Sequence, residues 1–168
     1  GVAVLEGLLA GRGGLAAPVV MQPVAARLRP RLAAHEMDGL VDLGDGLQVD
    51  VYNLHADAGQ DTDSQLARRN NIDQLISAIN TRSPAGTAVI VMGDTNCLYT
   101  RSPDDNVDSL RSGPGLTDVW VELVNSGVVP APGAEINSGC DTDPSGPDCE
   151  MIDKVFYRSG STVILTPL

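Results

Sequence analysis

The chain has 168 residues, a formal net charge of −11, and 42% hydrophobic residues. This composition favours one globular domain over wholesale disorder, and the acidity argues against a broad basic surface for nucleic acid. The sequence has no run of about 18 apolar residues, so it predicts no membrane-spanning helix.

The first 35 residues differ in composition from the rest of the chain. They are rich in Ala and Gly and hold four arginines and one acidic residue, Glu6, a formal charge of +3 that leaves −14 for residues 36–168. We therefore distinguish an atypical N-terminal segment, residues 1–35, from a domain, residues 36–168. Because the sequence starts at Gly1 without a basic leader, we expect a processed or trimmed chain, or a fragment of a larger protein.

A β-hairpin is the first predicted element. Apolar residues at positions 40, 41 and 43 precede Gly44-Asp45-Gly46, which is a turn signal. From Leu47 onward apolar and polar side chains alternate, which is typical of a half-buried strand. We expect this strand to continue to His55.

A helix follows. Thr62 and Gln65 have the spacing of a capping box, and Asp61 and Asp63 also suit a helix start. The stretch Ser83-Pro84-Ala85-Gly86 should end the helix. Arg68 is expected to face solvent. The apolar residues fit one stripe of a 3.6-residue period and should face the core: Leu66, Ile72, Leu75, Ile76 and Ile79.

The remaining elements complete the predicted fold class. The five apolar residues at 88–92 predict a strand buried on both faces. A short helix is expected at 116–124, a strand at 151–158 and a last strand at 162–166. This order predicts an α/β (α+β) sandwich in which mixed β-sheets are flanked by helices.

The three cysteines bear on whether the protein works in an oxidising compartment. Cys140 and Cys149 bound a turn-rich segment that can bring them within bridging distance. Zinc is the alternative, but neither a CxxC pair nor a nearby histidine supports it. A Cys140–Cys149 disulfide would imply an oxidising compartment and hence a secreted, extracellular protein. Cys97 is expected to be buried as a small apolar side chain.

Three polar clusters lie at the ends of predicted strands: Asn53 with His55 and Asp57, Asp94 with Asn96, and Asp153. Carboxylate and amide oxygens after a buried strand suit a hard cation or a bound water. The His55 imidazole suits donation to a phosphoryl oxygen, and Asp153 interrupts an apolar run, which is costly for an unpartnered carboxylate. The plain alternatives are turn chemistry after the strand, a structural histidine and a loop-capping aspartate.

Four stretches in this order resemble the endonuclease/exonuclease/phosphatase superfamily, the deoxyribonuclease-like fold: YNLHAD (52–57), VIVMGDTN (89–96), LTDVW (116–120) and IDKVFYR (152–158). The resemblance covers about residues 39–165. It implies hydrolysis of phosphate esters with Mg²⁺ or another divalent cation. A small phosphoester, a lipid head group or a nucleic acid would be the substrate.

The resemblance also implies roles for single residues. His55 would contact the scissile phosphate, Asp94 would orient or deprotonate the attacking water, and Asn96 would hold a phosphate oxygen. Asp153 would support the histidine or the phosphate. The metal ligands would be Asp94 and Asn96, and the substrate-binding residues would be Asn53 and Arg101. Asp118, in LTDVW, is expected to be structural.

Two features of that family are missing from this sequence. Its early metal-binding glutamate has no clear counterpart, because Glu6 and Glu36 do not follow apolar strands. Its terminal Ser-Asp-His is absent, because the chain's histidines are His35 and His55. We therefore expect a domain that is incomplete relative to the family, with sheet edges that a partner chain or oligomer would cover. The alternative to a metal-dependent phosphoester hydrolase is a non-catalytic interaction module or a fragment of a larger secreted protein.

Overall fold

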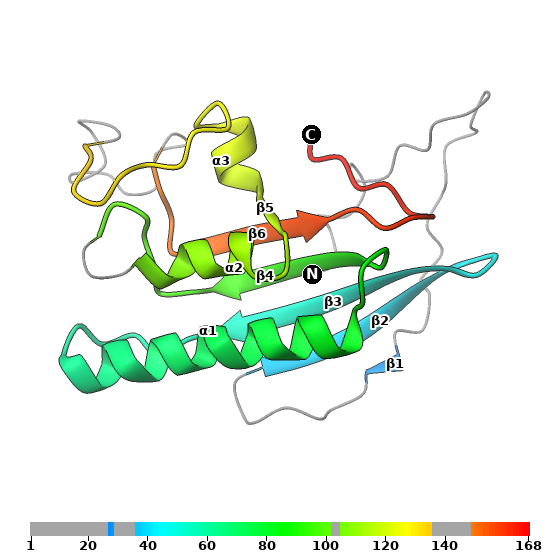
Figure 1. The fold of residues 1–168 in the computed structure, drawn as a ribbon, viewed down its shortest axis with the longest axis horizontal. Helices are drawn as coiled ribbons and strands as arrows, with labels where there is room; N and C mark the ends of the chain where they lie inside the picture. Colours follow the sequence, from blue (N-terminus) through cyan, green and yellow to red (C-terminus); the bar gives the residue numbers. More distant parts are fainter. Residues whose placement is uncertain (1–26, 29–35, 102–104, 136–148) are drawn as a thin grey trace.

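The computed structural model describes residues 27–28, 36–101, 105–135 and 149–168, and the core of the fold is a mixed β-sheet (Figure 1). Its spatial order is β1-β2-β3-β4-β6-β5, and every neighbouring pair is antiparallel except β3 and β4, which are parallel. The strands are β1 (Arg27–Leu28), β2 (Glu36–Gly44), β3 (Leu47–His55), β4 (Ala88–Asp94), β5 (Thr117–Asp118) and β6 (Asp153–Arg158). The predicted α/β class with a mixed sheet and helices is confirmed, and the described residues form a single sheet.

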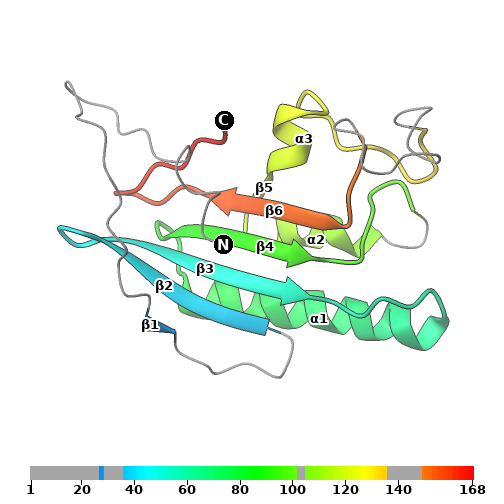
Figure 2. The same cartoon turned by 180° about the vertical axis from the view of Figure 1, so that it is seen from behind.

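The helices gather on one face of this sheet, as the view from behind makes plain (Figure 2). They are α1 (Thr62–Arg82), α2 (Asp108–Ser112), which follows a short 3-10 turn (Asp105–Val107), and α3 (Val119–Leu123). None of the described helices is long and apolar enough to cross a membrane. The helix α1 connects the parallel strands β3 and β4, as a crossover must.

The predicted hairpin is confirmed. Gly44, Asp45 and Gly46 all have positive φ, at 87°, 53° and 79°, a conformation that glycine and aspartate tolerate better than most residues. The Asp42 carboxylate accepts a hydrogen bond from the Gly44 amide at 2.9 Å, which supports the turn. This turn therefore sets the register in which β2 pairs with β3, the strand that ends at His55.

The helix α1 begins at Thr62, but its cap lies one residue before the Thr62 of the predicted capping box. The N-cap is Asp61, whose carboxylate accepts hydrogen bonds from the amides of Asp63 and Ser64 at 3.1 and 3.0 Å. A further hydrogen bond from the Ser64 hydroxyl is the main cause that lowers the pKa of Asp61. Gln65 does not close a capping box, because its side-chain Nε2 donates to the Gln60 carbonyl. Asp61 has the extended backbone that a cap needs, and Thr62 is already helical.

The buried stripe of α1 is also shifted from the prediction. Ile72 and Leu75 are fully buried, but Leu66 is 56% exposed, because the first turns of α1 extend past the end of the sheet (Figure 1). Arg68 is fully buried, contrary to the expectation of solvent. It lies four residues before Ile72 and so shares its face. Its guanidinium donates to the carbonyls of Asp57 and Gly59 at 2.9 and 2.7 Å.

Leu75→Ala should destabilise the protein by about 2–4 kcal/mol, because it opens a cavity in a closed core. Leu66→Ala should change stability by less than about 0.5 kcal/mol, because Leu66 is largely exposed. Urea unfolding of both variants measures the difference. Equal losses would show that the whole apolar stripe is buried, as the sequence pattern suggested.

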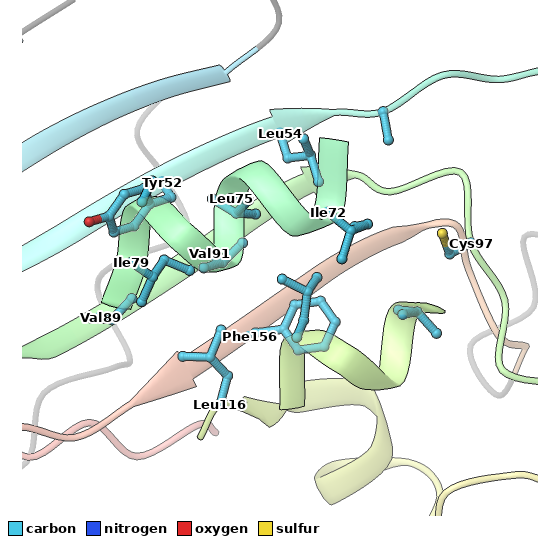
Figure 3. Packing of buried hydrophobic residues seen from close by; sticks show 14 of the residues in the cluster. Tyr52, Leu54, Ile72, Leu75, Ile79, Val89, Val91, Cys97, Leu116 and Phe156 are labelled. Atoms are coloured by element: carbon cyan, nitrogen blue, oxygen red, sulfur yellow. The ribbon is translucent and has the colours of Figure 1, made fainter. Parts of the chain in front are cut away.

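The main core lies between the helices and the sheet. Tyr52, Leu54, Val89, Val91 and Phe156 project from the strands toward α1 and α2 (Figure 3). The opposite face of the sheet carries a smaller apolar cluster, in which residues of β3 and β4 pack against the C-terminal segment: Val49, Ala88, Ile90, Val163 and Leu165. Each strand thus divides its side chains between two faces, as period-two alternation requires.

The strand predicted at 162–166 does not form. Instead, the Leu165 amide donates to the Ser159 hydroxyl at 3.0 Å, and the Gly160 amide donates to the Val163 carbonyl at 2.8 Å. These bonds fold the segment back on itself, so its amides have partners without a neighbouring strand. The segment still covers the sheet through Val163 and Leu165.

Candidate active site

Three of the predicted catalytic residues stand in line across the sheet. His55 ends β3 opposite Asp94 at the end of β4, and Asp94 in turn is opposite Asp153 at the start of β6. Val51, four residues before His55, and Met92, two residues before Asp94, pack against the cluster away from the helices. Because side chains alternate along strands, His55, Asp94 and Asp153 share the face that the helices leave open.

His55 and Asp94 are close enough to influence each other. The Nε2 atom of His55 lies 3.8 Å from Oδ2 of Asp94, too far for a hydrogen bond but within ion-pair range for a charged imidazole. The side chain of His55 is 68% exposed and that of Asp94 is 28% exposed. Both can therefore reach a bound ligand from solvent.

Gly93 brings the two strands together just before this pair. Its φ is +135°, and a Cβ built on it would lie 2.0 Å from the carbonyl oxygen of Leu54. No other residue fits there without moving β3 or β4. The Ala56 amide then donates to the Asp94 carbonyl at 2.9 Å, which extends the contact between the two strands past their ends.

Asn96 lies beside Asp94 but already has partners. Its amide N–H donates to Oδ1 of Asp94 at 2.9 Å, and its side-chain Nδ2 donates to the carbonyl of Ala56 at 2.8 Å. The residue is 8% exposed and has a φ of 50°, which asparagine tolerates in a tight turn. Asn96 thus ties the exits of β3 and β4 together.

Asp153 is exposed at the start of β6, and Thr95 fixes this strand against the β4 exit. The amide and the hydroxyl of Thr95 both donate to the carbonyl of Ile152, at 2.9 and 2.8 Å. Thr95 was not among the residues singled out in the sequence. Its position between Asp94 and Asn96 was the available signal.

The two predicted substrate-binding residues lie in different places. Asn53 is exposed on β3, two residues before His55 and so on the same face. Arg101 is half-buried, and its guanidinium donates to the carbonyl of Asn96, so it supports the loop that carries Asn96. The structure therefore brings Asn53 close to the catalytic line and places Arg101 behind that loop.

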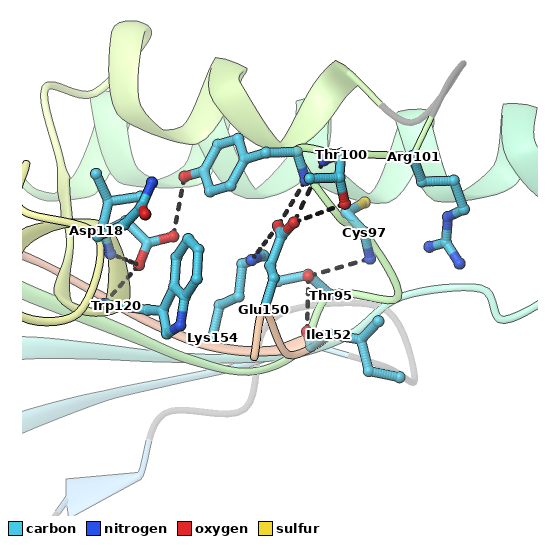
Figure 4. Close-up of polar contacts among 12 residues, drawn as sticks. Thr95, Cys97, Thr100, Arg101, Asp118, Trp120, Glu150, Ile152 and Lys154 are labelled. Carbon is cyan, nitrogen blue, oxygen red and sulfur yellow. Dashed lines mark hydrogen bonds and ion pairs between the residues drawn. The ribbon is translucent and has the colours of Figure 1, made fainter. Parts of the chain in front are cut away.

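A buried ion pair, which the sequence did not reveal, anchors the other side of the site (Figure 4). Lys154 Nζ lies 2.9 Å from Glu150 Oε1, with the two side chains 1% and 4% exposed. Glu150 also accepts hydrogen bonds from the amide of Tyr99 and from the amide and hydroxyl of Thr100. The ammonium lies 4.7 Å from the centroid of the Tyr99 ring and 5.9 Å from that of Trp120.

Asp118 is structural, as expected. It is fully buried, caps α3 through the amides of Trp120 and Val121, and accepts a hydrogen bond from the Tyr99 hydroxyl at 2.9 Å. Burial, together with the charge of Asp118, raises the pKa of Tyr99 far above its usual range. This tyrosine therefore acts as a neutral hydrogen-bond donor at every ordinary pH.

The cysteine predictions have different outcomes. Cys97 is buried, as expected, and its thiol donates to the Asn106 side chain at 3.7 Å. Cys149 is also buried, but Cys140 lies outside the described residues. The disulfide between them stays a prediction.

The donor set for a metal is small in the described part of the chain. No group of three histidine, cysteine, aspartate or glutamate side chains among these residues is arranged to hold a metal. The carboxylates of Asp94 and Asp153 are adjacent across the sheet, and Oδ1 of Asn96 is a further oxygen. One or two carboxylates suit Mg²⁺, which keeps several waters and takes further oxygens from a phosphate. These residues fit such a cation and do not form an all-protein cage.

Comparisons with known proteins show which proteins the chain resembles in sequence. No model of a known protein family matches the sequence. A sphingomyelinase of Mycobacterium bovis is 38% identical over 124 residues, as is one of Mycobacterium tuberculosis. The match covers 71% of this chain and 22% of each of these proteins, so the chain spans about a fifth of the length of the curated relatives it matches.

A solved structure also shares the fold. The endonuclease/exonuclease/phosphatase from Beutenbergia cavernae superposes with a TM-score of 0.52 and 18% identity, over 73% of this chain and 31% of that one. A beta toxin variant from Staphylococcus aureus, solved with bound magnesium ions, matches with a TM-score of 0.44 and 14% identity, over 73% of this chain and 41% of the toxin. With the motifs in order on this fold and a sequence match to sphingomyelinases, the chain belongs to the endonuclease/exonuclease/phosphatase superfamily.

Proposed function

We propose that this chain carries a phosphoester hydrolase site at the open end of β3 and β4. The observation that carries the proposal is the alignment of His55, Asp94 and Asp153 on neighbouring strands, on one face. An imidazole and two carboxylates that converge from distant parts of the sequence supply the groups that phosphoryl transfer uses for orientation and proton movement.

Each residue has a role that its position permits. His55 donates an N–H to a phosphoryl oxygen where negative charge develops. Asp94 orients the attacking water and accepts its proton, and Asp153 supports the imidazole or the phosphate. Asn96 keeps Asp94 and the β3 exit in place through its two hydrogen bonds. Its proposed contact with a phosphate oxygen would use the remaining N–H of its side chain.

A divalent cation, most simply Mg²⁺, completes the proposed site. Asp94 would hold it, with an oxygen of Asn96 or Asp153 nearby, and it would neutralise charge on the phosphate. The first substrate class to test is a lipid phosphodiester, because the curated relatives are named sphingomyelinases. We also propose that the protein is secreted, in keeping with the predicted Cys140–Cys149 disulfide.

The test is a comparison of Asp94→Asn with Asp73→Asn. Asp73 is an exposed aspartate of α1, and α1 covers the opposite face of the sheet. With bis-p-nitrophenyl phosphate and Mg²⁺, Asp94→Asn should lower kcat/KM at least about 100-fold, because it removes a proton acceptor. Asp73→Asn should have little effect, and EDTA should abolish turnover in both.

The second candidate function is that of a non-catalytic interaction module. It is favoured by the small donor set of the described residues, which holds no three-ligand metal group. Absence of turnover by the folded wild-type protein, across bis-p-nitrophenyl phosphate, sphingomyelin vesicles and single-stranded DNA, would reject the hydrolase and support the module.

A further inference from the structure

A cavity of about 420 Å³ opens beside the proposed catalytic line. It lies between the exit of β3 and one face of α1, and His55 belongs to both the cavity wall and the catalytic line. This volume is in the usual range for a small-molecule site. The cavity is lined by His55, Ala56, Asp57, Ala58, Ala67 and Asn71.

The lining residues give the cavity a distinct chemical character. Three are alanines, whose small side chains leave the space open. Asp57 is the one aspartate on the wall, and no lysine or arginine is among the lining residues. Asp57 is exposed at the surface, so its carboxylate is accessible to a group that enters the cavity. A second negative charge there would be repelled.

Hydrogen bonds fix the walls in place. The Asp57 amide donates to Oδ1 of Asn71 at 3.2 Å, and Oδ1 of Asp57 accepts from the Gly59 amide at 3.2 Å. The buried Arg68 donates to the Asp57 and Gly59 carbonyls, so its guanidinium is directed at the backbone of this loop. The loop is thus held against α1 before any ligand arrives, and a preformed wall discriminates better than a mobile one.

We propose that this cavity receives one ester substituent of a phosphodiester substrate, and that Asp57 selects against substituents with a negative charge. The proposal rests on the hydrolase site at His55 and Asp94, which would hold the phosphate at the mouth of the cavity. It predicts a preference for diesters with neutral or cationic substituents over polyanions such as nucleic acid. Asp57 is then a specificity-determining residue, which acts by charge repulsion.

Two substrates with the same leaving group test this preference. Thymidine 5′-(p-nitrophenyl phosphate) has a neutral substituent, and its 3′-phosphorylated form has an anionic one. The wild-type protein should favour the first by about tenfold in kcat/KM, since like charges within several ångströms repel even near a protein surface. Asp57→Asn should bring the ratio of the two kcat/KM values near to one.

Gln48→Lys is the matched control. It changes net charge by the same +1, but Gln48 lies seven residues before His55 in the same strand, roughly 23 Å away at ~3.3 Å per residue. This distance exceeds the screening length at physiological salt. Gln48→Lys should therefore leave the ratio unchanged. An equal shift in both variants would mean that net charge, and not the cavity, sets the preference, and would overturn the proposal.

A binding measurement separates this proposal from the hydrolase proposal. Wild-type protein should bind thymidine 5′-monophosphate several-fold more tightly than thymidine 3′,5′-bisphosphate in a calorimetric titration, and Asp57→Asn should bind both alike. Discrimination in binding without any turnover would reject the hydrolase and retain the cavity's selectivity. Turnover with equal treatment of both substrates and both nucleotides would retain the hydrolase and reject the selectivity.

Discussion

Lys154→Met should destabilise the protein by about 3–5 kcal/mol, because it would leave the carboxylate of Glu150 buried without its countercharge. Lys154 and Glu150 are 1% and 4% exposed, and their charged atoms lie 2.9 Å apart. Methionine keeps much of the length of lysine but cannot donate a hydrogen bond. The loss should therefore come from the uncompensated charge and not from a cavity.

Lys154→Met should also disturb the candidate active site. Glu150 holds the amides of Tyr99 and Thr100, in the segment that follows the β4 exit, and Lys154 is the neighbour of Asp153. Weakening this contact should loosen Asp153 relative to Asp94. We expect faster hydrogen exchange at residues 99 and 100 under native conditions.

Urea unfolding measures the stability effect, with two comparisons. Arg111→Met removes an ion pair with Asp108 whose side chains are 32% and 52% exposed, and should cost less than about 1 kcal/mol. The double variant Lys154→Met/Glu150→Gln should be more stable than the sum of its single variants predicts, since it removes both charges. Additive losses would show that the two charges do not stabilise each other.

Gly93→Ala should be at least as damaging, with a loss above about 4 kcal/mol or failure to fold cooperatively. The added Cβ would lie 2.0 Å from the Leu54 carbonyl oxygen, a backbone atom of the strand with which Gly93 pairs. The φ of +135° is also unfavourable for alanine. Any relief would move the end of β4 away from β3, and so separate Asp94 from His55.

Gly127→Ala is the control that introduces backbone strain without a steric clash. Gly127 has a φ of +76°, but a Cβ there meets nothing within 4 Å, so this variant should lose only about 1 kcal/mol. Thermal unfolding followed by circular dichroism compares the two. A mild loss for Gly93→Ala, equal to that for Gly127→Ala, would contradict the close approach of the strands.

Much of the local structure was predictable because short-range patterns specify it. Gly44-Asp45-Gly46 gave the hairpin turn, and the apolar run at 88–92 gave the buried strand β4. The long helix was also predictable, but its cap was not, because Asp61 and Thr62 are both good capping residues. The choice between them depends on where the backbone turns from extended to helical, which packing against the sheet sets.

The sequence pattern also led to His55, Asp94 and Asp153 as separate strand-end residues. Their alignment on one face depends on the strand order, with β4 between β3 and β6, which no local pattern specifies. The same holds for Arg68. Its charge suggested that it would face solvent. In the structure it lies on the buried face of α1, where the carbonyls of residues 57 and 59 accept hydrogen bonds from its guanidinium.

Local residue order thus specified the turn, the main helix, the central strand and the chemical groups available for a site. Folding in three dimensions specified which of these groups meet, because contacts between residues far apart in the chain depend on how the strands pair and pack. Glu150 and Lys154 illustrate the difference. Their pairing looks like an ordinary surface ion pair in the sequence, and only its enclosure by Tyr99, Thr100 and Trp120 makes it a buried support for the strand that carries Asp153.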